Sequence, residues 1–349
     1  MLYHHGPTSL LDLKTDNRGK GALLEALRKY REKLALDPRD KLFGILGILP
    51  EDVRKDFRAN YDLSVKDVYV EVVDYVLKTT QCLDIICDAI HFPVYTSAMK
   101  LPSFVPDWSY NNDVESIAGQ WDFSAAGSTH AQCSFVDERL NKLKIAAIYL
   151  GTVRQNGVSV GTIYRRDDFL MAFLHWRAIL LDRDNKRDRR FRQQAQQDFA
   201  SSLCFGQDPL CKMDPEEWLV VCYNVFANLL RKQLPHLPLD SVLQAKVSHR
   251  VHKSSLERVQ FFKDHFQYPM IGRCLCLTDD LVGLGSGFMV PGDIVVVPLG
   301  CSTPIILRSE GTRDEYRFVG DVYINGYMHG EAVDERKSGK RELTQYFLH

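Results

Sequence analysis

Two pairs of residues in this 349-residue chain carry side chains that often bind metal ions. Cys274 and Cys276 are separated by one residue, and His249 and His252 by two. Structural zinc sites use paired CxxC motifs and zinc proteases use HExxH, and neither pair has that spacing. Residues two apart on a strand share one face, so we expect both cysteines to point into a core. We predict no metal site and no cofactor.

A glycine-rich segment, Gly283-Leu284-Gly285-Ser286-Gly287, has the composition of a phosphate-binding loop. Closely spaced glycines let backbone N–H groups approach an anion. This segment lacks the GxGxxG spacing, the Walker lysine and a following helix, and strand-like residues flank it. We interpret it as a turn between strands, where glycine supplies a positive φ.

Nucleophilic catalysis needs a cysteine or serine, a base and an orienting acid. His130 with Cys133, or Cys211 with nearby acids, supplies these residue types. With nine cysteines and eleven histidines such combinations arise by chance, and the sequence has no GxSxG elbow. The cysteines lie mostly in apolar runs, which favours buried thiols. We assign no catalytic residue, and the sequence leaves open whether the protein is an enzyme.

Two short segments say more about geometry than about catalysis. In Asp37-Pro38-Arg39-Asp40 the proline ends a helix, and the arginine can pair with a carboxylate through two hydrogen bonds. In Leu101-Pro102-Ser103-Phe104-Val105-Pro106-Asp107-Trp108 two prolines fix an extended path that presents aromatic anchors, and Asp107 can accept backbone or indole hydrogen bonds. We interpret this segment as a packed junction between subdomains, with a ligand or partner contact as the alternative. The candidate pocket or junction residues are Arg39, Asp40, Asp107, Trp108 and Trp121.

Charge and hydropathy restrict the class of protein. The 44 Lys and Arg balance 45 Asp and Glu, so no overall field attracts nucleic acid or an anionic membrane. The basic stretch from Arg183 to Arg192 also contains acidic residues, and we interpret it as a solvated helix face. Neither a membrane-length apolar run nor a signal peptide is evident. We expect a globular cytoplasmic protein whose partner is another protein or a small-molecule ligand, not nucleic acid or a membrane.

Helical patterns dominate the N-terminal part. A first amphipathic helix is predicted over 21–36, where it ends before Pro38. A second begins at Ser64, which with Asp67 imitates a capping box. Its apolar stripe has the spacing of one helix face. The stripe consists of Val65, Val68, Tyr69, Val72, Val73, Val76 and Leu77.

The middle of the chain begins with two strands of a hairpin, 135–140 and 143–153. Asp214 and Pro215 mark the start of a helix there. The segment 233–253 is interpreted as a linker or loop because it contains prolines and polar residues. The predicted helices are 166–181, 189–203, 215–232 and 254–266.

Short apolar runs separated by glycine, proline and aspartate follow residue 271, which favours a small antiparallel barrel or sandwich. The predicted strands are 273–277, 293–297, 304–308, 316–320 and 322–324. The fold class is therefore α+β: N-terminal and central helices with a strand hairpin, and a C-terminal antiparallel β-rich, barrel-like unit. We divide the chain into a mainly helical part at 1–130, the hairpin with the helical centre at 131–270, and the β-rich unit at 271–349.

Several of these segments, in this order, resemble the region that follows the heterokaryon-incompatibility (HET) domain in fungal proteins. They are 37–47, 61–69, 101–108 and the C-terminal phrases Pro291-Gly292-Asp293-Ile294-Val295, Tyr316-Arg317-Phe318-Val319-Gly320 and Tyr327-Met328-His329-Gly330. The resemblance covers about residues 37–334. The HET domain itself, with an early Trp-Gly and a later Cys-Ile-Asn-Gln motif, would precede residue 37, where neither motif occurs. The resemblance thus implies a HET-like protein that lacks this domain.

Three functions follow from the resemblance. The first is a truncated HET-like protein with a regulatory or recognition role in fungal incompatibility or signalling through a partner. The second is an enzyme of fungal secondary metabolism that acts on a small molecule in a pocket near Trp108. The third is a degenerate relic that folds poorly because apolar surface is left uncovered.

Overall fold

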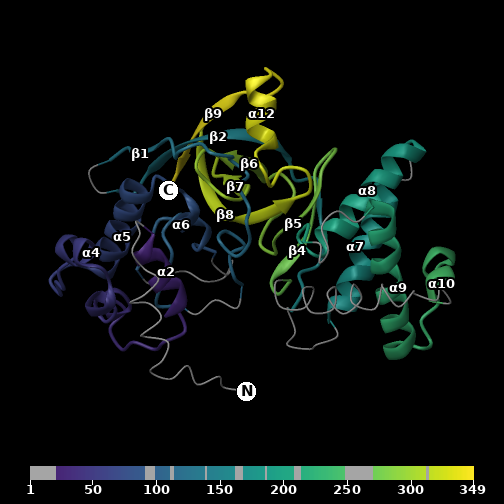
Figure 1. The fold of residues 1–349 in the computed structure, drawn as a ribbon, viewed down its shortest axis with the longest axis horizontal. Coiled ribbons are helices and arrows are strands. Elements are labelled where there is room, and N and C mark those ends of the chain that lie inside the picture. Colours follow the sequence, from purple (N-terminus) through teal and green to yellow (C-terminus); the bar gives the residue numbers. More distant parts are fainter. Residues whose placement is uncertain are drawn as a thin grey trace.

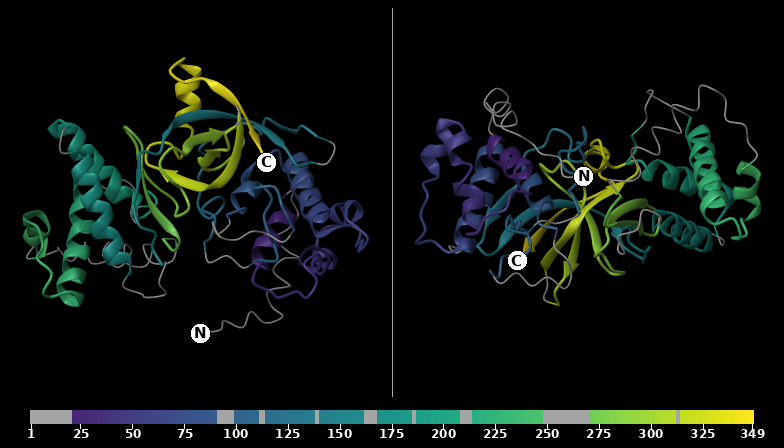
Figure 2. Two further views of the ribbon diagram at one scale, coloured as in Figure 1. Left: turned by 180° about the vertical axis from the view of Figure 1, so that it is seen from behind. Right: turned by 90° about the horizontal axis from the view of Figure 1, so that it is seen from below.

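A β-sheet that curls into a ring lies between two groups of helices (Figure 1). The view from below keeps the same order of helices, barrel and helices (Figure 2). Helices and strands thus combine in one α+β fold, as the sequence predicts. The computed structural model describes residues 21–90, 99–110, 114–137, 140–161, 168–184, 187–207, 214–247, 270–311 and 314–349.

The helices on one side of the barrel, here called the N-terminal unit, include the capped helix that the sequence predicts. Ser64 Oγ accepts the Asp67 N–H at 3.1 Å, and the Asp67 carboxylate accepts the Ser64 N–H at 3.3 Å. The apolar stripe from Val68 to Leu77 is buried, because the β-branched residues pack against the rest of the unit. The unit comprises α2 (Ala22–Lys29), α3 (Asp40–Phe43), the 3-10 helix η1 (Leu46–Ile48), α4 (Glu51–Asp56), α5 (Val65–Thr80) and α6 (Asp84–Cys87).

The first helix is shorter than predicted. Helix α2 ends at Lys29 rather than at residue 36. Lys41 Nζ donates to the carbonyl oxygen of Arg31 at 2.7 Å and so holds the following segment in turns. Leu34 and Leu36, which continue the apolar repeat in the sequence, are 98% and 104% exposed. The apolar repeat therefore led to a predicted helix that is longer than the part that packing stabilises.

The sheet contains a closed ring, because β9 pairs with both β2 and β8. The ring runs β2-β6-β7-β8-β9, and from β8 the sheet continues through β5 and β4 to β3. Pairing of the described strands is antiparallel except between β8 and β9. The strands are β1 (Cys133–Phe135), β2 (Leu143–Thr152), β3 (Gln155–Asn156), β4 (Arg273–Leu277), β5 (Val282–Ser286), β6 (Ile294–Pro298), β7 (Ile305–Ser309), β8 (Glu315–Ile324) and β9 (Leu343–Leu348).

Strand β2 separates two hydrophobic cores. Ile145 and Ala147 pack into the core that includes the N-terminal unit, whereas Ala146 and Ile148 pack into the core on the opposite side. Successive side chains of a strand point to opposite faces, so both faces of β2 are covered. This explains why its sequence is apolar at consecutive positions rather than alternating.

The predicted hairpin is present, but its first strand lies earlier in the chain than the predicted 135–140, which shares only Phe135 with it. Strand β1 ends at Phe135, because the Asp137 carboxylate accepts the N–H groups of Asn141 at 2.8 Å and Lys142 at 3.1 Å and closes the turn. The hairpin joins the same sheet as the C-terminal strands, since β2 pairs with β6. The predicted strands 316–320 and 322–324 form the single strand β8, and the sequence patterns missed β9 and helix α12 (Glu331–Lys337).

Residues 283–286 of the glycine-rich segment lie in strand β5, so the interpretation as a turn was wrong there, and only Gly287 lies in a turn. The strand pairs with β4 on one side and β8 on the other. A Cβ added at Gly283 would lie 2.1 Å from the carbonyl oxygen of Tyr323, and one at Gly285 would lie 2.8 Å from Cδ1 of Ile306. Glycine is needed here because neighbouring atoms approach closely, not because φ is positive.

The helices on the other side of the barrel are here called the helical arm. Two of them, α8 and α9, begin at the residues that the sequence predicts. The Asp214 carboxylate accepts the Glu216 N–H at 3.3 Å, and Pro215 occupies the first helical position. The predicted loop 233–253 is wrong in part, because it contains helix α10. The predicted helix 254–266 lies outside the described residues. So do His249 and His252. The arm comprises α7 (Asp168–Asp184), α8 (Arg189–Ser202), α9 (Pro215–Gln233) and α10 (Ser241–Val247).

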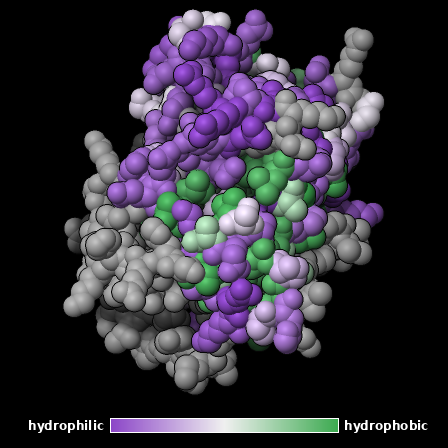
Figure 3. Space-filling model, turned by 90° about the vertical axis from the view of Figure 1, so that its right-hand side faces the viewer, coloured by the Kyte–Doolittle hydropathy of each residue, from purple (hydrophilic) through white to green (hydrophobic). Residues whose placement is uncertain are grey.

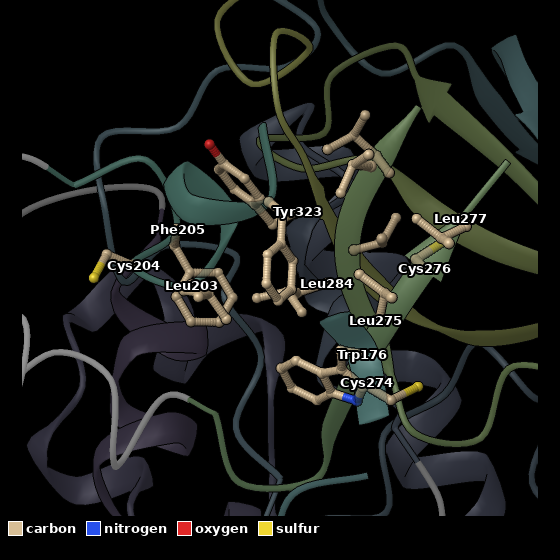
Figure 4. Packing of buried hydrophobic residues seen from close by; sticks show 14 of the residues in the cluster. Trp176, Leu203, Cys204, Phe205, Cys274, Leu275, Cys276, Leu277, Leu284 and Tyr323 are labelled. Atoms are coloured by element: carbon tan, nitrogen blue, oxygen red, sulfur yellow. The ribbon is translucent and has the colours of Figure 1, made fainter. Parts of the chain in front are cut away.

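The arm is attached to the barrel by a buried aromatic cluster. Phe205, which follows α8, packs edge to face against Tyr323 of β8, with ring centroids 5.9 Å apart (Figure 4). The fully buried Trp176 of α7 donates from Nε1 to the carbonyl oxygen of Val158 at 2.7 Å. Cys274 and Cys276 are both fully buried in this core. Packing and hydrogen bonding therefore fix the arm relative to the sheet.

Candidate functional site

Arg39 forms the predicted two-point ion pair, and its partner is Asp37. The distances are 2.7 Å from Nη2 to Oδ2 and 3.0 Å from Nε to Oδ1. These hydrogen bonds hold the pKa of the Asp37 carboxyl below its usual value. Arg39 Nη1 also donates to the carbonyl oxygen of Leu63 at 2.8 Å, and Tyr61 Oη donates to Asp40 at 2.6 Å. Arg39 and Asp40 thus connect the start of α3 to the segment before α5.

Asp107 and Trp108 lie in the core instead of on an open surface. Their exposed fractions are 0% and 1%. The Asp107 carboxylate accepts the N–H of Ser109 at 3.0 Å and its hydroxyl at 2.5 Å, so the predicted backbone bond is present. The Trp108 indole N–H has no hydrogen-bond partner among the described residues. The guanidinium of Arg31 lies 5.4 Å from the centroid of the indole ring.

A second arginine beside this junction holds α2 against the end of α6. Arg28 Nε donates to the Asp88 carboxylate at 2.7 Å, and both terminal nitrogens of Arg31 donate to the Asp88 carbonyl oxygen at 3.2 and 3.3 Å. Burial raises the pKa of the Asp88 carboxyl, and the charge of Arg28 opposes that rise. Burial also lowers the pKa of Arg31. Arg28 and Arg31 therefore position α2 by binding Asp88.

The sequence patterns missed two fully buried charges in this region, Arg273 on β4 and Asp321 on β8. Arg273 Nη1 donates to Asp321 Oδ1 at 2.5 Å, and both side chains have 0% exposed surface. Arg273 Nη2 also donates to the Glu115 carbonyl oxygen at 2.6 Å. The second Asp321 oxygen accepts the Ile117 N–H at 2.6 Å and the Ser116 hydroxyl at 2.9 Å. The pair joins the barrel to the segment after Trp108.

The segment that carries Trp108 also contacts the barrel directly. Ser103 N–H donates to the carbonyl oxygen of His349 at 3.0 Å, and Ser103 Oγ accepts the Phe318 N–H at 3.0 Å. Trp121 lies elsewhere, because it stacks on Phe205 in the core of the helical arm with centroids 5.0 Å apart. The structure therefore brings Asp107 and Trp108 together but does not bring Trp121 to them.

The described cysteines are free thiols, and most are fully buried. The sulfur atoms of Cys87 and Cys301 lie 3.7 Å apart where α6 meets the turn after β6. Their hydrogen bond, together with burial, raises the pKa of Cys87, and burial raises the pKa of the half-buried Cys133 to about 11. A thiol with a raised pKa is a poor nucleophile at neutral pH. Cys211 lies outside the described residues, which contain no group of three or more potential metal ligands.

A pocket of about 680 Å³ lies on the helical arm, away from Trp108. Its lining combines apolar residues of α7 and α9 with arginines and glutamines of α8. The basic stretch of the sequence reaches this pocket, because Arg189 and Arg192 belong to the first turn of α8 and are exposed. The lining residues are Leu181, Asp182, Arg189, Arg192, Gln193, Gln196 and Leu219.

Comparisons with known proteins identify the barrel. Curated proteins gave no match, and solved structures gave none. None of the described helices has the length and apolar character needed to cross a membrane. Residues 239–347 match the family model of the Het-6 beta-barrel domain, a region that includes strands β4 to β8 and most of β9. Strand β2, which closes the ring, lies outside that match. The C-terminal region of this chain thus matches the Het-6 beta-barrel domain, a domain associated with heterokaryon incompatibility.

Proposed function

We propose that the protein acts in heterokaryon incompatibility, or in signalling related to it, by binding a protein partner. In this proposal the barrel is a scaffold that holds the N-terminal unit and the helical arm in fixed positions, so that their outer surfaces can be recognised. The Het-6 beta-barrel match supports a role in heterokaryon incompatibility. The position of a helical unit on each side of the barrel supports recognition by a partner.

The observation that carries the proposal is the burial of Asp107 and Trp108. A catalytic pocket must expose its polar groups to a substrate. Here the Asp107 carboxylate is bound by Ser109, and the neighbouring arginines Arg28 and Arg31 are bound by Asp88. These groups stabilise a junction between units, which is what a recognition scaffold requires.

The experiment is chemical cross-linking of the tagged protein in living fungal cells, followed by identification of the cross-linked peptides. The proposal predicts repeated cross-links from the outer helices to one partner protein. Cross-links confined to the chain itself, together with turnover of a small molecule by the purified protein, would contradict it.

A small-molecule ligand at Trp108 is the second candidate function. The observation that favours it is the pair of unsatisfied buried donors, Trp108 Nε1 and Arg31 Nε, which lack partners among the described residues. A buried donor without a partner costs free energy, and a ligand with an acceptor atom would remove that cost. A screen of fungal metabolites by thermal shift tests it, because a specific ligand raises the melting temperature of the wild type more than that of Trp108→Phe.

A further inference from the structure

The pocket on the helical arm combines an apolar floor with a basic rim. Leu181 of α7, 38% exposed, and Leu219 of α9 supply apolar surface. Figure 3 faces this side of the molecule and shows hydrophobic side chains near its middle, with hydrophilic side chains around them. Arg189 and Arg192 stand three residues apart on α8, so they lie on the same helix face.

The two rim arginines are distinct from their basic neighbours. Arg187 is engaged by the ring of Phe191 at 4.7 Å and by the carbonyl oxygen of Asp279 at 3.2 Å. Arg183 lies 5.5 Å from the same ring. Arg189 and Arg192 have no carboxylate within ion-pair distance among the residues that the structure describes. Their charges therefore remain available to a ligand.

Acidic groups also lie near the pocket, and none of them forms an ion pair with Arg189 or Arg192 among the described residues. The Asp188 carboxylate accepts the N–H of Phe191 at 2.8 Å and caps α8. Glu216, at the start of α9, accepts a hydrogen bond from Gln193. Asp182 is the one carboxylate in the lining. The lining residues themselves carry two arginines and one aspartate, so the lining has a net positive charge.

We infer that this pocket binds an acidic amphipathic segment of a protein partner. A leucine-like side chain of the partner contacts Leu181 and Leu219, and flanking carboxylates pair with Arg189 and Arg192, for which guanidinium geometry is well suited. Nucleic acid fits less well, because a phosphate backbone has no apolar side chain to place against Leu181 and Leu219. This inference rests on the proposed function, since it names the surface through which a partner would be recognised.

The test uses the full chain and a fluorescein-labelled peptide of alternating glutamate and leucine blocks, measured by fluorescence anisotropy. Arg189→Ala/Arg192→Ala is expected to weaken binding at least about tenfold, because two charge-assisted contacts are lost. Arg190→Ala is the matched control: this arginine is exposed on the same turn but outside the lining, and its loss should change affinity less than about twofold. Both variants alter exposed side chains, and unchanged melting temperatures verify folding.

Three results of the binding assay would overturn the inference: equal binding of a lysine and leucine peptide, an equal loss with Arg190→Ala, or equally strong competition by a single-stranded oligonucleotide. Concentration-dependent dimerisation that Arg189→Ala/Arg192→Ala abolishes would also overturn it, because the occupant would then be a second copy. If cross-linking in cells finds a partner that the double variant retains, the pocket inference fails while the proposed function stands. If the wild-type protein cross-links to no partner in cells, the proposed function fails, whether or not the labelled peptide binds to the pocket.

Discussion

Arg273 of β4 and Asp321 of β8 form an ion pair, with both side chains fully buried. The pair also binds the backbone of residues 115–117 and so connects β4 and β8 to the segment that follows Trp108. Its oxygen and nitrogen atoms are almost fully hydrogen-bonded, although Arg273 Nε has no partner among the described residues. The pair therefore fixes the segment that follows Trp108 against β4 and β8.

Breaking this pair should strongly destabilise the protein. Asp321→Ala leaves the guanidinium of Arg273 buried without a counter-charge, and we expect the free energy of unfolding to fall by about 3–5 kcal/mol. Urea denaturation followed by circular dichroism measures the loss. The exposed pair Arg154 and Asp279 is the control, and Asp279→Ala should leave the urea midpoint nearly unchanged. A similar, small shift for both variants would show that the buried pair is not a major contact.

The glycines of β5 should not tolerate a side chain. Gly283→Ala places a methyl group against the carbonyl oxygen of Tyr323, and we expect a loss of about 1–3 kcal/mol or failure to fold. Gly47→Ala is the control, because no atom lies within 4 Å of a Cβ there. Thermal denaturation of the two variants compares them. If Gly283→Ala melted at the wild-type temperature, the close packing of β5 on β8 would be wrong.

Acid should weaken the contact between α7 and the start of α10. Burial tends to raise the pKa of Asp240, but Arg177 and the N–H groups of Val242 and Leu243 hold it below the ordinary value of 3.8. A carboxyl whose pKa is lowered by folding contributes stability above the unfolded pKa, and that contribution is lost as the pH falls through the folded pKa. Melting temperatures of wild type and Asp240→Asn should therefore differ at pH 6, and the difference should shrink as the pH falls below the ordinary pKa of 3.8. A difference that stays constant or grows on acidification would contradict this sign.

The buried thiols should be unreactive in the native protein. Burial raises the pKa of Cys204 and Cys222 well above the ordinary value of 9.0, and the contact with Cys301 does so for Cys87. Iodoacetamide labelling at neutral pH, read by mass spectrometry, should modify these three cysteines only after denaturation, and the same holds for Cys301 because it is buried. Rapid labelling of native Cys87 or Cys301 would show that α6 separates from the barrel more readily than its contacts indicate.

The sequence predicted those elements whose signals are local. The capping box of Ser64 and Asp67, and the start of α9 at Asp214 and Pro215, depend on neighbours along the chain, and both are present. Helix α2 was overextended because an apolar repeat does not show where packing ends, and Leu34 has nothing to pack against among the described residues. The family resemblance was confirmed only through the barrel region.

Other features depend on contacts distant in sequence. Strand β5 was taken for a turn because its glycines serve the close approach of β8, which no local pattern reveals. A charged residue within an apolar strand, such as Arg273 beside Cys274, was a usable signal for a buried pair, but its partner Asp321 lies 48 residues away. Trp121 was grouped with Trp108 on residue type alone, and the two indoles pack in different cores.

The most direct test of the account is the mass of the protein when it is purified intact from a fungal host, measured by size-exclusion chromatography with light scattering. A scaffold that acts through a partner should elute as a defined complex of this chain with one second protein, at a constant ratio across the peak. Elution as the single chain, with a metabolite bound at Trp108 and converted to product, would contradict the account.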